Sequence, residues 1–123
     1  MGKFERQQEN EKVIQWCNVL ANAVNMVSPN EIKRLRSCNA TVYVYKDIDI
    51  TDENGVVLLE NETIYLLFSY NTAVAAVIES MNFGVDYLRL VYGYTATSSQ
   101  HIAKFFKDYL NPFHPSHTIQ YHE

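Results

Sequence analysis

The sequence has 123 residues, of which 47% are hydrophobic and 20% charged, and its net charge is −4 at neutral pH. This length and composition predict one globular domain with an apolar core, and they exclude a disordered chain. The negative net charge disfavours broad, non-specific binding to nucleic-acid phosphate.

Several features predict a cytoplasmic protein with no membrane association. The N-terminal stretch MGKFERQQENEK is polar and charged, so we expect no signal peptide. No apolar run reaches the roughly 18 residues that a membrane-spanning helix needs. Two cysteines, Cys17 and Cys38, occur without a Cys-x-x-Cys motif, and we interpret them as reduced thiols.

Residues 1–39 predict a helical pair. Over residues 4–27, apolar side chains recur at steps of four and three, which is the period of a helix with one buried face. The segment Ser28-Pro29-Asn30-Glu31 combines a Ser cap, a Pro at the first helical position and a Glu three residues after the cap. We therefore expect a second, short helix that ends near residues 38–39.

From Ala40 the period of apolar residues changes to two, which predicts strands over residues 40–92. In the first strand, one face is expected to carry Val42, Val44, Ile48 and Ile50. The other face is expected to carry Tyr43, Tyr45, Asp47 and Asp49. The pair Asn54-Gly55 predicts a hairpin with a type I′ turn, since both residues tolerate positive φ.

The remaining strands are predicted over residues 56–59, 63–70, 73–79 and 85–92, with turns at 60–62 and at Asn71-Thr72. A capping box at Thr97–Gln100 begins a helix over 97–110, followed by a tail over 111–123 without periodicity. The inward side of this helix is expected to carry Ile102, Phe105, Phe106, Tyr109 and Leu110. Its outer side is expected to carry His101, Lys104, Lys107 and Asp108. The predicted fold of the single domain 1–123 is therefore α+β, with five mainly antiparallel strands and a C-terminal helix on one face.

The predicted hairpin is rich in carboxylates, which are Asp47, Asp49, Asp52, Glu53, Glu60 and Glu62. They could form an acidic surface that docks on a basic groove of another protein. They could instead hold Ca²⁺ or Mg²⁺, or simply keep the hairpin solvated. An EF-hand is excluded because Asp52 and Leu58 stand where its Gly and Glu are needed. We predict the docking surface, and no metal ligand.

Tyrosines are abundant, with nine in the chain. Those predicted to contact a partner are Tyr43, Tyr45 and Tyr65, because a tyrosine ring combines apolar area with a hydroxyl group. The same rings could pack beneath the helices or stack on nucleic-acid bases. The cations Lys33, Arg34 and Arg36 provide the alternative, a basic helix that binds nucleic acid.

The histidines leave two further possibilities. His114, His117 and His122 could form a metal cluster near the C-terminus. His101 follows Ser98 and Ser99, so that a Ser–His pair of a small hydrolase can be imagined, although no Gly-x-Ser-x-Gly motif is present. We predict no catalytic residue, no cofactor and no enzymatic activity.

Two segments resemble a diffuse family of small uncharacterised proteins of bacteriophages and mobile elements. They are Ser69-Tyr70-Asn71-Thr72-x-Val74-Ala75 and Tyr94-x-Ala96-Thr97-x-Ser99-x-His101-Ile102-x-x-Phe105. The resemblance implies a phage or mobile-element origin and a place in the host cytoplasm. It also implies an accessory protein that binds a host or defence protein. The acidic hairpin and the tyrosines favour an inhibitor of the anti-CRISPR kind. An unpaired strand edge and the apolar helix face also make a homodimer plausible.

Overall fold

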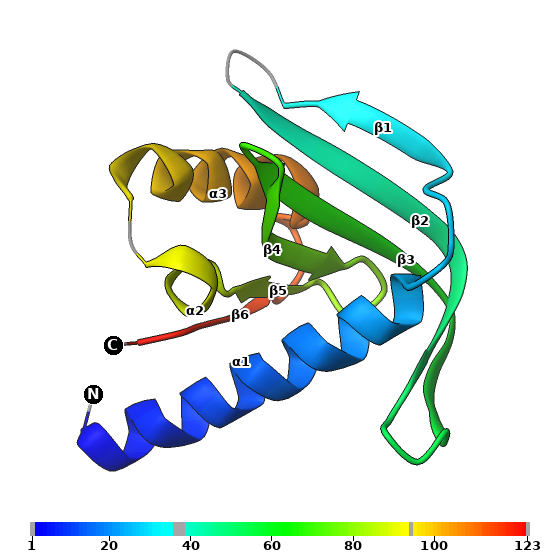
Figure 1. Cartoon of the computed structure of the whole chain (residues 1–123), viewed down its shortest axis with the longest axis horizontal. Helices are drawn as coiled ribbons and strands as arrows, with labels where there is room; N and C mark the ends of the chain where they lie inside the picture. The colour runs from blue at the N-terminus through cyan, green and yellow to red at the C-terminus, as the bar shows by residue number, and fades with distance from the viewer. Residues whose placement is uncertain (1, 36–38, 94, 123) are drawn as a thin grey trace.

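The structure is a computed structural model that describes residues 2–35, 39–93 and 95–122. Within these ranges the chain forms three helices and a six-stranded sheet with the strand order β1-β2-β3-β4-β5-β6 (Figure 1). The elements are α1 (Lys3–Val24), β1 (Glu31–Arg34), β2 (Ala40–Thr51), β3 (Val57–Ser69), β4 (Thr72–Ile78), β5 (Phe83–Asp86), α2 (Leu88–Tyr92), α3 (Ala96–Tyr109) and β6 (His117–Gln120). Neighbouring strands are antiparallel except β5 and β6, which are parallel. Arg36, Cys38 and Tyr94 lie outside the described ranges.

The sheet has an apolar core on each face. One core joins α1 to the sheet through Val13, Val19, Leu20, Tyr45, Ile48, Ile50, Ile64 and Leu66, among others. The other joins α3 to the sheet through Val42, Val44, Leu67, Val74, Val77, Ile102 and Phe105, among others. Figure 1 shows α1 and α3 well apart, with β4, β5 and β6 between them. The α+β class is confirmed, and the fold is helix, sheet, helix in three layers.

The predicted second helix is wrong. Its residues form β1, which pairs along β2 from Glu31 opposite Val44 to Arg34 opposite Thr41. The residues of the helix-start signal lead into β1 instead, and the Asn30 side chain accepts a hydrogen bond from the backbone N–H of Lys46 in β2. A helix of this length is marginal without packing, whereas strand pairing satisfies its backbone and covers the edge of β2.

The predicted faces of β2 are also wrong, because a β-bulge reverses them. Tyr45 lies opposite Ile64 and Ile48 lies opposite Glu62, so that two residues of β2, Lys46 and Asp47, stand against one of β3. The φ angle of Asp47 is 57°. As a result, Ile48 and Ile50 pack against α1, whereas Val42 and Val44 pack against α3.

The β2–β3 hairpin is longer than predicted. Residues 60–62 form no turn; β3 runs through them, with shifts of register on either side of Ile50 and a positive φ of 53° at Asn61. At the tip, the Gly55 N–H donates to the Asp52 carbonyl, and Gly55 alone has positive φ, at 81°. This geometry is a type I turn followed by a left-handed glycine, which corrects the predicted type I′ turn.

The chain after β3 follows the prediction in part. Tyr70 and Asn71 form the β3–β4 turn with φ angles of 51° and 74°, one residue earlier than expected. The predicted strand 85–92 divides into β5 and the short helix α2, since a short apolar run is compatible with either structure. The α3 helix begins at Ala96, after Thr95, whose hydroxyl accepts a hydrogen bond from the Ser98 N–H.

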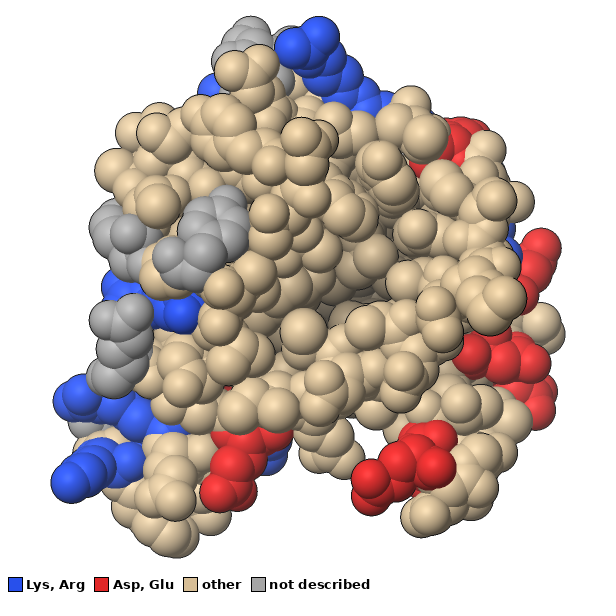
Figure 2. Space-filling view, in the orientation of Figure 1, with Lys and Arg blue, Asp and Glu red and all other residues tan. Residues whose placement is uncertain are grey.

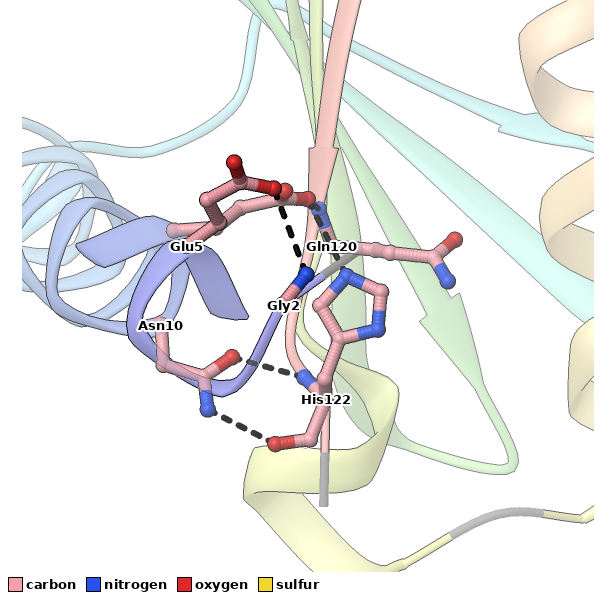
Figure 3. Close-up of polar contacts among 6 residues, drawn as sticks. Gly2, Glu5, Asn10, Gln120 and His122 are labelled. Carbon is pink, nitrogen blue, oxygen red and sulfur yellow. Dashed lines mark hydrogen bonds and ion pairs between the residues drawn. The ribbon is translucent and has the colours of Figure 1, made fainter. Parts of the chain in front are cut away.

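The tail, for which no element was predicted, supplies β6 and reaches α1. Figure 3 shows the Asn10 side chain hydrogen bonded to both backbone groups of His122, each at 2.7 Å. The Glu9 carboxylate accepts from the Gln120 N–H at 3.1 Å. These bonds attach the start of α1 to the end of the sheet.

Candidate functional site

Two carboxylates of the predicted acidic surface bond to the backbone of the β2–β3 hairpin itself, and a third, Glu62, bonds to Ser80 between β4 and β5. The Asp52 side chain accepts from the backbone N–H groups of Asn54 and Val56, at 2.8 and 2.9 Å. The Asp49 side chain accepts from the Asn61 N–H at 3.0 Å. Glu62 is buried and accepts a hydrogen bond from the Ser80 hydroxyl. Their role in the hairpin could not be seen from the sequence, because it depends on where the backbone turns.

Asp47, Glu53 and Glu60 are the carboxylates of this set whose side chains are exposed with no backbone bond assigned to them. The same hairpin carries an unexpected feature, the consecutive residues Val56, Val57 and Leu58, whose exposed fractions are 58%, 45% and 47%. We call these six residues the hairpin patch. Figure 2 shows acidic side chains on the lower right of the molecule, where the β2–β3 hairpin extends past α1 in Figure 1.

A groove of about 460 Å³ separates the hairpin tip from α1. Its α1 side includes Glu11, Ile14 and Asn18, and its hairpin side includes Asp52 and Glu53. Ile14 is 39% exposed and gives the α1 side of this groove an apolar side chain. Among the described residues, no group of three or more His, Cys, Asp or Glu side chains could hold a metal ion.

The three tyrosines predicted to contact a partner are divided between the two faces of the sheet. Tyr45 is only 5% exposed and belongs to the core beneath α1, so it cannot offer its ring to a partner. Tyr65 is half-buried on the α3 side, where its ring lies 4.6 Å from that of Tyr109 and its hydroxyl donates to Glu79. Burial and the Glu79 carboxylate raise the pKa of Tyr65 above the ordinary value.

Tyr43 remains partly exposed and lines a second groove of about 560 Å³ over β1, β2 and β3. Its ring lies 4.4 Å from that of Phe68, and Tyr70 stands at the rim with 57% exposure. Ile32 and Arg34 of β1 line the same groove. Tyr43 and Tyr65 are therefore both partly exposed, on opposite faces of the sheet, and Phe68 and Tyr70 accompany Tyr43.

The basic run does not form a basic face. Lys33 and Arg34 are neighbours in a strand, so their side chains point to opposite faces of the sheet. The Lys33 ammonium lies 3.2 Å from the Glu31 carboxylate, and the Arg34 guanidinium donates to the Asn39 side chain. Arg36 is outside the described residues. The sequence reasoning failed here because it assigned a helix to a strand.

The Ser–His pair proves to be a buried cluster. The Ser69 hydroxyl lies 2.8 Å from the Ser98 hydroxyl and 3.0 Å from Nδ1 of His101. The three residues are 0%, 1% and 4% exposed, so His101 is not on the outer side of α3 as predicted. Within the described part of the chain, no carboxylate is hydrogen bonded to His101, which a hydrolase of the Ser-His-Asp type would require. The cluster attaches α3 to the end of β3.

Burial and, secondarily, the Lys104 ammonium lower the pKa of His101 below its ordinary value of 6.5. The unfolded chain then binds a proton at a higher pH than the folded chain, so acid favours unfolding. We expect the free energy of unfolding to decrease as the pH falls through 6.5, and urea titrations at several pH values measure it. The His101→Asn variant keeps an acceptor near Nδ1 and should show a flatter profile; an identical slope in both proteins would contradict the assignment.

The C-terminal histidines do not converge. His122 lies with Nε2 at 3.3 Å from the Glu9 carboxylate and is held by Asn10 through its backbone. His114 and His117 are exposed, and the latter pairs with Phe83 at the start of β6. The possible metal cluster thus gains no support from the described residues.

Comparison with known proteins gives one match. The family of unknown function DUF8033 matches residues 30–119, which extend from β1 to β6 and leave α1 outside. The searches of curated proteins and of solved structures returned no match. No helix in the described ranges is long and apolar enough to cross a membrane. Because the match covers most of its length, the chain belongs to the DUF8033 family of unknown function.

Proposed function

We propose that this protein acts without catalysis, by binding another protein through the hairpin patch. The observation that carries the proposal is the exposure of three consecutive apolar residues, Val56, Val57 and Leu58, near the hairpin tip, where they give both faces of the hairpin exposed apolar area. Contiguous exposed apolar side chains rimmed by polar residues are typical of protein-binding surfaces. The carboxylates of Asp47, Glu53 and Glu60 add a negative rim, which favours a partner whose own surface is apolar at the centre and basic around it.

The finer proposal concerns the partner. The resemblance to phage and mobile-element proteins supports a host or defence protein, and nucleic-acid-binding defence proteins have the basic surfaces that this rim would fit. On this proposal the protein is an inhibitor of the anti-CRISPR kind in the host cytoplasm. The alternative, a nucleic-acid-binding regulator, has less support because Lys33 is paired with Glu31 and the two described cations face apart.

The proposal is tested by combining Val57→Ser, Glu53→Lys and Glu60→Lys. These side chains are exposed and make no assigned hydrogen bond, unlike Asp49 and Asp52. We expect the affinity for a partner captured from host lysate to fall at least about tenfold, because loss of central interface contacts commonly costs more than 1 kcal/mol. Calorimetry or surface plasmon resonance with the purified partner measures this.

The matched control is Lys104→Glu with Lys107→Glu, two exposed charge reversals on α3. It should leave binding unchanged, and the melting temperatures of both variants should stay within a few degrees of the parent. If the hairpin variant binds as well as the parent, the hairpin patch is not the contact surface. Gel shifts with random DNA and RNA at low salt test the alternative, which predicts a salt-dependent shift.

A further inference from the structure

One edge of the sheet has no strand or helix against it among residues 2–35, 39–93 and 95–122. At the β6 edge, the Gln120 N–H is used by the Glu9 carboxylate of α1, and α1 runs beside the strand. At the other edge, β1 pairs only with β2. The four residues of β1 are all exposed, and the Ile32 side chain is 61% exposed. Three of the four residues of β1 are charged, and charged, short edge strands limit pairing, so a strand added here has to complement those charges.

The backbone of this edge offers bonding groups at two residues. The Leu35 N–H donates to the Ala40 carbonyl at 2.9 Å, which fixes the alternation of the β1–β2 ladder. Lys33 and Glu31 therefore bond to β2, and the N–H and C=O groups of Ile32 and Arg34 point away from it. A strand added at this edge would have to bond to Ile32 and Arg34.

The side chains of the edge are complementary to themselves. If Ile32 lies opposite Ile32 of a second, antiparallel copy, then Glu31 lies opposite Lys33 of that copy, and Lys33 opposite its Glu31. Directly opposed side chains of unlike charge stabilise a strand pair. The other two-fold registers that bond through Ile32 or Arg34 place Lys33 opposite Lys33 or Arg34 opposite Arg34, which is unfavourable. Only the first register joins the apolar pair to two ion pairs.

We propose that β1 pairs with β1 of a second copy about a two-fold axis at Ile32, and that the two sheets become continuous. This interface uses none of the six residues of the hairpin patch, so the inference goes beyond the proposed function and does not depend on it. It is isologous, as in most homodimers. Only four residues of each chain form the edge, which places the contact below the standard interface size and predicts a weak, reversible dimer.

The test uses charge exchange at Glu31 and Lys33, followed by sedimentation velocity and native mass spectrometry up to about 1 mM, where even a contact worth about 4 kcal/mol is half formed. The parent should dimerise as its concentration rises. Glu31→Lys alone and Lys33→Glu alone should each be monomeric, because each opposes like charges across the axis. An equimolar mixture of the two should form a heterodimer, and the double variant should dimerise again.

The mixture separates this contact from effects within one chain. Glu31 also lies near Lys33 and Lys46 of its own chain, but those ion pairs cannot be restored by adding a different molecule. Ile32→Pro removes an outward N–H without removing a bond to β2 and should give a monomer, whereas Ile32→Val should dimerise. A parent that is monomeric throughout, or single variants that do not associate when mixed, would overturn the proposal.

Discussion

Replacing Phe105 by alanine is expected to lower the free energy of unfolding by about 3–5 kcal/mol, the cost typical of removing a buried aromatic ring. Phe105 is fully buried in the core between α3 and the sheet. Its ring lies 5.6 Å from that of Phe106 and 5.3 Å from that of Tyr109. Urea denaturation followed by circular dichroism measures the change as a lower midpoint with an unchanged slope.

The chain contains a matched control for this change, since Phe113 is 90% exposed. Phe113→Ala removes the same atoms and should change the free energy of unfolding by no more than about 0.5 kcal/mol, as is usual for surface positions. A Phe105 variant as stable as the Phe113 variant would mean that α3 does not close the second core.

The longest helices could be predicted from the sequence because their apolar side chains repeat with the period of the helix itself. The stripe of α3, including Ile102 and Phe105, and that of α1, including Val13 and Leu20, need no knowledge of their partners. The hairpin around Gly55 was also foreseen, since its glycine has positive φ. In each case the signal lies within a few residues of the element that it predicts.

The elements that were missed depend on distant residues. β1 and β6 have four residues each and exist through pairing with β2 and β5, which leaves no periodic signal in their own sequences. The bulge at Asp47 reverses the faces of β2. The sequence does not reveal this bulge, because an exposed aspartate is equally compatible with a regular strand. Register and strand partners are tertiary properties that no local pattern determines.

The candidate site, like the fold, could be predicted only in part. The cluster of carboxylates was visible because it is a matter of composition. Only the path of the backbone shows that Asp52 accepts hydrogen bonds at the turn and that Glu53 does not. The exposure of Val57 and Leu58 was missed because an apolar strand is usually assumed to be covered. Ser69 could not be joined to His101 because thirty-two residues separate them.

Deleting Asp49 is expected to lower the free energy of unfolding by about 2–5 kcal/mol, the cost of removing one buried isoleucine from a core. With the bulge kept, Ile50 would turn away from α1; with the bulge lost, Ile48 would turn away instead. The side chains of Ile48 and Ile50 are now buried in the core beneath α1, with exposed fractions of 7% and 0%, respectively. No register of the shortened strand keeps both in place.

Deleting Asp47 removes the same residue type two positions away and should cost no more than about 1 kcal/mol, as for a change at an exposed site. The shortened strand becomes regular, so Ile48 and Ile50 still face α1, and the positive φ of Asp47 disappears. Asp49→Ala controls for loss of the hydrogen bond from the Asn61 N–H, which is worth about 1 kcal/mol. Urea midpoints rank the three variants, and equal losses from both deletions would show that no bulge sets the faces of β2.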